Sequence, residues 1–177
     1  MKSILLIPLV TIHFALVSFH INALSTGTDP ALDNIKNFQV NTPTMVSAGM
    51  PNPEQFKALK SNGVSNIIDL LPGDRSEESK LIKSLQLQYH NIAVEWGNPT
   101  LENFDEYVVT MRKLENDGDI TLTHCKLNWR GGVFTYLYRV TQLDVPEAIA
   151  KEDLDAIWQP NQIWQRFIHD VKEKYKN

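Results

Sequence analysis

The chain's one cysteine lies in a segment whose residue types could bind and attack an oxyanion. Residues 124–132 read His-Cys-Lys-Leu-Asn-Trp-Arg-Gly-Gly, between an apolar run at 120–123 and a run of helical length at 133–140. We therefore expect a strand, a tight loop and a helix N-terminus, where backbone amides and the helix dipole favour an anion. Arg130 could grip two oxygens of a tetrahedral anion, and the same field would favour the reactive thiolate of Cys125.

Cys125 also has a simpler interpretation, because a single cysteine after a strand is often a small buried apolar residue. His124, Arg130 and the glycine pair after it favour a functional anion site over this alternative. A lone cysteine cannot form an internal disulfide, so the fold must depend on its packing.

Helical and strand patterns alternate on both sides of this loop. Helices are expected from Pro53 to a stop at Gly63, over 77–85 and over 101–114, and after Leu143 with starts near Pro146 and Pro160. Strands are expected over 64–71, 87–94 and 120–123, with a further edge strand within 38–47. This alternation predicts an α/β fold, a three-layer sandwich around a central, mainly parallel sheet. Cys125 would lie at the carboxyl end of its strand, the edge where such sheets place ligands.

Two apolar sets are predicted to pack in the core. Residues of the first fall on one face of the helix after Thr100, at helical spacing: Leu101, Phe104, Val108, Met111 and Leu114. Residues of the second lie near the C-terminus: Trp158, Ile163, Trp164, Phe167 and Val171.

The N-terminus resembles a secretory signal. Lys2 precedes an apolar run to Phe19, and Ala23 offers a small residue for cleavage near Leu24. The run is short for a membrane span and contains Pro8, so we expect no stable membrane insertion after cleavage. The resulting division is a signal peptide at 1–23, a linker at 24–36 and one domain at 37–177, in a periplasmic or secreted protein.

Charge and composition exclude several function classes. The net charge of −4 argues against a general nucleic-acid binder, so an anionic substrate would be drawn in by local fields at the loop. The five histidines show no His-x-x-His spacing and there is no Cys-x-x-Cys. Neither a metal nor another cofactor is therefore expected.

Four segments resemble the bacterial branch of the dual-specificity, protein-tyrosine-phosphatase-like superfamily, near the phosphatase-like domain of β-lactamase-like hydrolases. They are 48–56 (AGMPNPEQF), 63–70 (GVSNIIDL), 98–101 (NPTL) and the loop 124–130 (HCKLNWR). The resemblance runs from about residue 37 to the C-terminus. It implies a protein tyrosine phosphatase-like fold and hydrolysis of a phosphorylated protein or a small-molecule phosphate ester.

The resemblance also implies residue roles. Cys125 would attack phosphorus and form a phosphocysteine, and Arg130 would clamp the phosphate oxygens. His124 would help to hold the loop in shape. An acid on a neighbouring loop would protonate the leaving oxygen, with Glu95 the first choice and Asp74 the second. Backbone amides would form the phosphate cradle, from residues Lys126, Leu127, Asn128, Trp129 and Arg130.

The loop departs from the superfamily pattern in its length. The superfamily places five residues between the cysteine and the arginine, whereas four separate Cys125 from Arg130, and Gly131 stands where the arginine is expected. Three functions therefore remain open: a phosphatase, a non-catalytic phosphate- or protein-binding pseudophosphatase, and a rhodanese-like sulfurtransferase, since rhodanese-like enzymes share the shorter spacing. Trp96 and Trp129 could line an aromatic pocket or could pack in the core.

Overall fold

The fold is built on one mainly parallel sheet. The computed structural model describes residues 30–114 and 119–176, and the expected signal peptide at 1–23 lies outside them. Within these residues the strands are β1 (Gln39–Thr42), β2 (Met45–Ala48), β3 (Val64–Asp69), β4 (Gln88–Asn91) and β5 (Ile120–His124). They form a sheet in the order β1-β2-β5-β3-β4. Only β1 runs antiparallel to its neighbour, and the other pairs are parallel.

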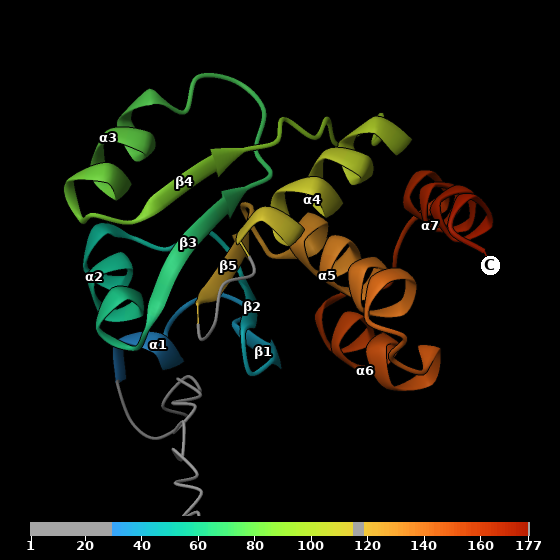
Figure 1. Ribbon diagram of the computed structural model, residues 1–177, viewed down its shortest axis with the longest axis horizontal. Coiled ribbons are helices and arrows are strands. Elements are labelled where there is room, and N and C mark those ends of the chain that lie inside the picture. The colour runs from blue at the N-terminus through green and yellow to red at the C-terminus, as the bar shows by residue number, and fades with distance from the viewer. Residues whose placement is uncertain (1–29, 115–118, 177) are drawn as a thin grey trace, which may run out of the picture.

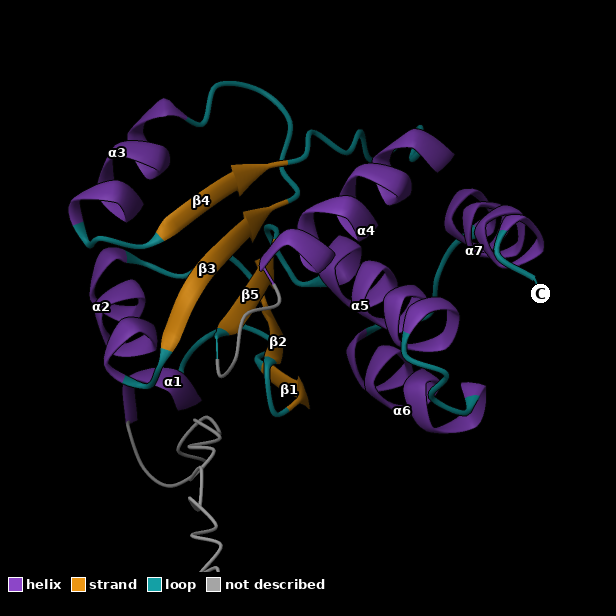
Figure 2. Cartoon of the chain, in the orientation of Figure 1, coloured by secondary structure: helices purple, strands orange, loops and turns teal. Residues whose placement is uncertain are grey.

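Helices cover both faces of this sheet. They are α1 (Pro30–Asp33), α2 (Pro53–Ser61), α3 (Ser76–Ser84), α4 (Leu101–Leu114), α5 (Trp129–Gln142), α6 (Glu147–Ile157) and α7 (Gln162–Lys174). Figure 1 shows α1, α2 and α3 on one side of the strands and α4, α5, α6 and α7 on the other, and Figure 2 separates the two helical layers from the strands. A buried apolar cluster fills each interface. The predicted three-layer α/β sandwich is confirmed.

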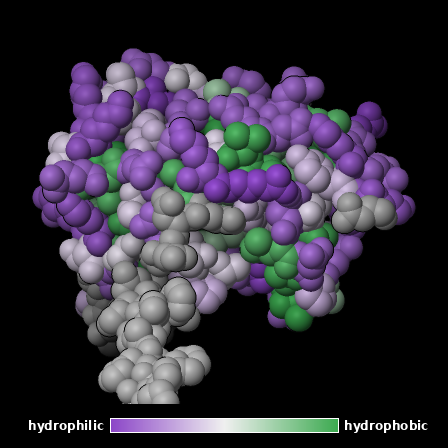
Figure 3. Space-filling model, viewed as in Figure 1, coloured by the Kyte–Doolittle hydropathy of each residue, from purple (hydrophilic) through white to green (hydrophobic). Residues whose placement is uncertain are grey.

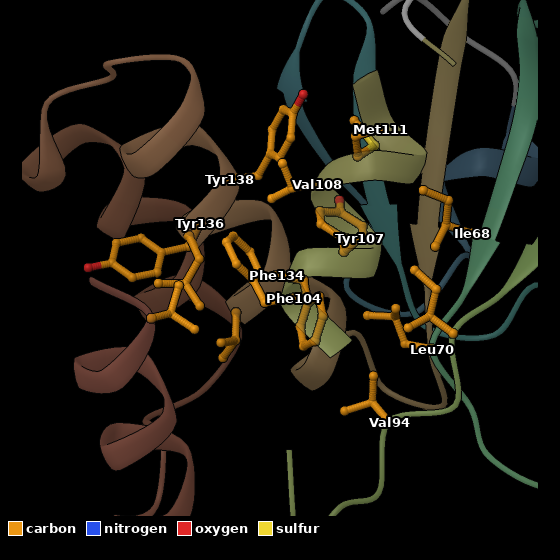
Figure 4. Close-up of a cluster of buried hydrophobic side chains, with 14 of the residues drawn as sticks. Ile68, Leu70, Val94, Phe104, Tyr107, Val108, Met111, Phe134, Tyr136 and Tyr138 are labelled. Carbon is orange, nitrogen blue, oxygen red and sulfur yellow. The ribbon is translucent and has the colours of Figure 1, made fainter. Parts of the chain in front are cut away.

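The core between α4, α5 and the sheet is rich in aromatic side chains (Figure 4). The ring of Phe134 packs edge-on against Phe104 and Tyr107, with centroids 5.8 and 5.3 Å apart. The Tyr107 hydroxyl shares a hydrogen bond of 2.7 Å with the Thr123 hydroxyl on β5. The predicted stripe on α4 is buried, except that Leu101 is only partly covered. These contacts fix α4 and α5 against the strand that carries the cysteine loop.

The segment 38–47 differs from its prediction as a single edge strand. It forms a hairpin of β1 and β2, and β2 lies inside the sheet beside β5. All of β2 is buried, as a strand covered on both faces requires. The next difference is in β4, which ends at Asn91 rather than near Val94, although the Ile92 amide still donates to the Asp69 carbonyl at 2.9 Å.

Two further predictions need correction. The described part of the expected linker at 24–36 packs on the domain, because Leu32 and Ile35 are buried in the cluster with α1 and α2. The domain therefore begins before residue 37. Ile163 is 45% exposed rather than packed, while Trp164 beside it is fully buried.

The face of the molecule seen in Figure 3 is mainly polar. Hydrophilic residues cover most of the face seen in Figure 3, with hydrophobic residues in separate patches. Among the described residues, none of the helices combines the length and the apolar character that crossing a membrane would need.

Candidate active site

The cysteine loop begins where β5 ends, between two parallel strands. His124 pairs in register with Ala48 of β2 and Asp69 of β3, and the Cys125 amide donates to the Ala48 carbonyl at 3.3 Å. Cys125 is 1% exposed. The strand therefore delivers the cysteine to the carboxyl edge of the sheet, as the sequence predicted.

Helix α5 starts earlier than the run 133–140 suggests. It begins at Trp129, and Asn128 before it adopts a left-handed conformation with φ of 63°. Asparagine tolerates this conformation better than most residues with a side chain. The Asn128 carbonyl then accepts the first helical hydrogen bond, from the Gly132 amide at 2.8 Å. Arg130 consequently lies in the first turn of the helix.

Two asparagines, Asn37 and Asn128, join the cysteine loop to the N-terminal segment. The Asn37 side-chain amide donates to the Leu127 carbonyl at 2.8 Å, and the Asn128 side-chain amide donates to the Asn37 carbonyl at 2.7 Å. Asn128 also donates to the Ser47 hydroxyl at 3.0 Å. We call these three hydrogen bonds the asparagine lock, and they hold the loop against the N-terminal segment and β2.

A backbone contact adds to the asparagine lock. The Met50 amide donates to the Lys126 carbonyl at 3.4 Å, so that carbonyl points toward the 49–50 segment. Because a peptide group is planar and trans, the Leu127 amide of the same peptide points the opposite way. The Leu127 amide is therefore directed away from the 49–50 segment.

The short spacing between Cys125 and Arg130 is linked to close packing around Asn128. A Cβ atom on Gly131 would lie 2.3 Å from the Asn128 side-chain oxygen, closer than atoms can approach. Asn128 is fully buried and held by the asparagine lock, so it cannot move aside easily. Glycine is therefore required at position 131, where the superfamily's loop, which is one residue longer, would carry its arginine.

A pocket of about 240 Å³ opens at the start of α5. It brings together most of the predicted site residues, and its lining consists of Trp96, Cys125, Lys126, Leu127, Trp129 and Arg130. Asn128 is buried outside this lining and holds the loop. The predicted nucleophile and the predicted oxyanion clamp thus share one cavity.

Arg130 is held in place by the segment after β4. Its Nε donates to the Val94 carbonyl at 2.9 Å, and its guanidinium carbon lies 5.3 Å from the centroid of the Trp96 ring. A guanidinium over an indole face is attracted to the negative face of the ring. These contacts use Nε and one face of the group, and the guanidinium carries further N–H donors at its two Nη atoms.

The chain's four tryptophans gather around this pocket. Trp96 lies within 5.6 Å of Trp129, Trp158 and Trp164, measured between ring centroids, and Trp129 stacks on Trp158 at 5.1 Å. Both interpretations of Trp96 and Trp129 therefore hold, because each packs against other rings and also lines the pocket.

The two predicted acids lie outside the lining of the cysteine pocket. The Glu95 side chain is exposed, and its role as general acid stays a prediction. Asp74 is also exposed, and the Ser76 amide, which donates to its carboxylate at 2.9 Å, holds the pKa of Asp74 below its usual value. A general acid at neutral pH needs the opposite shift, so Asp74 is poorly suited to the role.

A buried ion-pair network that sequence patterns do not predict lies beside the loop. Asp69 accepts hydrogen bonds from Arg75 Nε at 2.6 Å and from the Tyr89 hydroxyl at 2.8 Å, and Arg75 also pairs with Glu78. Glu78 Oε1 lies 3.0 Å from His124 Nε2. A carboxylate at the end of an apolar strand, Asp69, is the one feature of the sequence that could have pointed to it.

This network also contains three groups that could ligate a metal ion. Ligand atoms of Asp69, Glu78 and His124 all lie within 4.8 Å of one another. Arg75 already binds one oxygen of each carboxylate, so a divalent cation would sit beside a guanidinium. The residues present therefore fit an ion-pair network better than a metal site.

Comparisons with solved structures agree with this architecture. The catalytic domain of the PP-IP phosphatase Siw14 from S. cerevisiae superposes with a TM-score of 0.66 at 16% identity, over 80% of this chain and 90% of that chain. TpbA from P. aeruginosa, in complex with pTyr, gives a TM-score of 0.61 at 16% identity, over 88% of this chain and 97% of that chain. The fold is thus the protein tyrosine phosphatase-like fold.

A more similar structure identifies the family. The "Putative phosphatase (DUF442)" from Shewanella putrefaciens superposes with a TM-score of 0.73 at 30% identity, over 84% of this chain and 99% of that chain. The chain belongs to this DUF442 family of protein-tyrosine-phosphatase-like phosphatases. No family model matches the sequence, and no curated protein matches it.

Proposed function

We propose that the chain is an exported phosphatase that hydrolyses phosphate monoesters through a phosphocysteine on Cys125. The observation that carries this proposal is that Cys125 and Arg130 line one pocket at the start of α5. The Cys125 thiolate attacks phosphorus, forming an S–P bond as the P–O bond to the leaving group breaks. Water then attacks phosphorus, which releases phosphate and restores the thiolate.

The surrounding residues supply the other parts of the proposed reaction. Arg130 and the loop amides stabilise the charge on the phosphate oxygens, as donors fixed before the reaction do most effectively. Glu95 is the proposed donor of a proton to the leaving oxygen, because it lies between Val94 and Trp96, which both contact Arg130. Glu95→Gln should then slow alkyl phosphates more than aryl phosphates, since only a poor leaving group needs the proton.

The proposed substrates are a phosphorylated protein or a small-molecule phosphate ester. Trp96 and Trp129 in the pocket wall support an ester with an aromatic leaving group, because flat rings pack well on indoles. The structural likeness to TpbA bound to pTyr supports the same choice. An aryl phosphate is therefore the substrate with which to test activity.

Hydrolysis of p-nitrophenyl phosphate tests the proposed function. The wild-type chain should release p-nitrophenol without added metal, and Cys125→Ser should lose this activity, because serine lacks the reactive thiolate. A wild-type chain that leaves the ester intact but takes one sulfur onto Cys125 from thiosulfate would instead be a sulfurtransferase. A chain that does neither, while phosphate still protects Cys125 from alkylation, would be a binding domain.

Export is part of the proposal and depends on residues 1–23, which lie outside the described structure. The basic Lys2 and the apolar run after it support it. Mass spectrometry of the protein from its native host should show an N-terminus near Leu24, and an intact Met1 would contradict export.

A further inference from the structure

The segment between β4 and α4 holds Arg130 in the pocket and is itself a loop. It takes a tight turn at residues 95–98, where the Asn98 amide donates to the Glu95 carbonyl at 3.2 Å. A Cβ atom added to Gly97 would meet nothing within 4 Å among the described residues, apart from its chain neighbours. The tip of the turn is therefore not packed, and the contacts that fix the turn lie at its other residues.

Trp164 of α7 contacts this turn from the interior of the protein. Its indole Nε1 donates to the Trp96 carbonyl at 3.2 Å, and the centroids of the two rings lie 5.3 Å apart. Trp164 is fully buried, and a buried indole N–H usually donates to a partner in the protein. Here that partner is a backbone carbonyl of the pocket wall. One side chain therefore holds both the backbone and the ring of Trp96.

Trp164 is itself held firmly by α7 and the core. It lies in the first turn of the helix, where its amide donates to the capping side chain of Asn161 at 3.2 Å. Its ring packs edge-on against Phe167, with centroids 5.6 Å apart, and both rings belong to the core cluster. The start of α7 therefore fixes the indole N–H in place before any ligand binds.

These contacts form a continuous path from α7 to Arg130. Trp164 holds Trp96, and the guanidinium carbon of Arg130 lies 5.3 Å from the centroid of the Trp96 ring. Arg130 Nε donates to the carbonyl of Val94, two residues before Trp96. Both contacts to Arg130 thus come from the segment that Trp164 holds. Because a guanidinium grips two oxygens only in a suitable orientation, a shift of this segment would weaken its hold on an anion.

We propose that Trp164 is a positioning residue, which orients the Arg130 guanidinium toward the oxygens of a bound phosphate by holding Trp96. Trp164 lies outside the lining of the cysteine pocket, so it acts through Trp96 and not by touching the ligand. The proposal rests on the proposed function, since it takes Arg130 as the oxyanion clamp. It gives α7, which follows the cysteine loop by more than thirty residues, a part in anion binding.

Calorimetric titration with tungstate, a tetrahedral oxyanion like phosphate, tests this role. Trp164→Phe removes the N–H donor and keeps an aromatic ring, so the Kd of tungstate should rise about tenfold, within the range of coupling between residues in contact. The matched control is Tyr136→Phe, which removes the hydrogen bond of 2.8 Å from the Tyr136 hydroxyl to Glu147 and also keeps a ring. Tyr136 is buried outside the cysteine pocket, so the control should leave the Kd unchanged. Equal values for the wild type and Trp164→Phe would overturn the proposal.

A double-mutant cycle separates positioning of Arg130 from a general loss of structure. If Trp164 acts through Arg130, then Trp164→Phe should change the Kd by less than about twofold in a chain that already carries Arg130→Lys. A purely structural role would give the same loss in both backgrounds, because effects of independent sites add. The same tenfold loss in the presence of Arg130→Lys would therefore overturn the proposal.

A second variant covers the case in which Trp164→Phe does not fold. Trp164→benzothienylalanine replaces the indole N–H by sulfur and keeps the size of the ring, so the Kd of tungstate should still rise, and an unchanged Kd would overturn the proposal. A wild-type chain that binds no tungstate would overturn it together with the assignment of Arg130 as the clamp. Tungstate binding needs no turnover, so these results stand apart from whether the chain hydrolyses phosphate esters.

Discussion

Replacing Arg130 with lysine should lower kcat/KM for p-nitrophenyl phosphate by about a hundredfold to a thousandfold, the effect of losing one fixed oxyanion donor. Lysine keeps the positive charge but lacks the planar guanidinium that can grip two oxygens. It also loses the paired contacts to the Val94 carbonyl and the Trp96 ring that fix Arg130 in the pocket. Steady-state kinetics measures the effect.

The matched control for Arg130→Lys is Arg166→Lys, because Arg166 is exposed on α7 and lies outside the cysteine pocket. The control should leave kcat/KM unchanged. Phosphate should also protect Cys125 from alkylation far less in Arg130→Lys than in the control. Equal activity and equal protection in both variants would show that Arg130 is not the oxyanion clamp.

Replacing Asn128 with alanine should lower the free energy of unfolding by about 2–4 kcal/mol. The Asn37 carbonyl and the Ser47 hydroxyl would each lose the hydrogen bond that the Asn128 side-chain amide donates to them. Alanine would also be strained at the positive φ of 63°. Urea denaturation followed by circular dichroism measures the change.

A second variant at this position separates the two causes. Asn128→Gly removes the hydrogen bonds but accepts the left-handed conformation without strain, so it should lose less stability than Asn128→Ala. Iodoacetamide should alkylate the cysteine of both variants with a changed rate, because the loop is no longer held by the asparagine lock. Stability equal to wild type in Asn128→Ala would show that this lock does not hold the loop.

The sequence predicted the layers of the fold because local signals were strong. At α2, the side chain of the predicted cap Asn52 accepts from the Gln55 amide at 2.9 Å, and the Asn52 amide donates to the Gln55 side-chain oxygen at 2.9 Å. The hairpin of β1 and β2 was missed because two four-residue strands with a short turn resemble one irregular edge strand. What decides that β2 lies inside the sheet is its pairing with β5, far along the chain.

The candidate site was predictable where its residues are close in sequence. Cys125 and Arg130 share a loop, so their meeting in one pocket follows from local structure. The early start of α5 was not predictable, because the left-handed turn at Asn128 depends on its contacts with Asn37, ninety-one residues earlier. Glu78 was missed for the same reason, since only the fold brings α3 to the end of β5.

The most direct test of the central claim is to trap the phosphocysteine. The wild-type chain mixed with p-nitrophenyl phosphate and quenched in acid within milliseconds should carry one phosphoryl group on Cys125, located by mass spectrometry of its peptides. Arg166→Lys should form the same adduct, and Cys125→Ser should form no phosphocysteine. Turnover of the ester with no phosphoryl group on Cys125, or with the group on another residue, would contradict the mechanism.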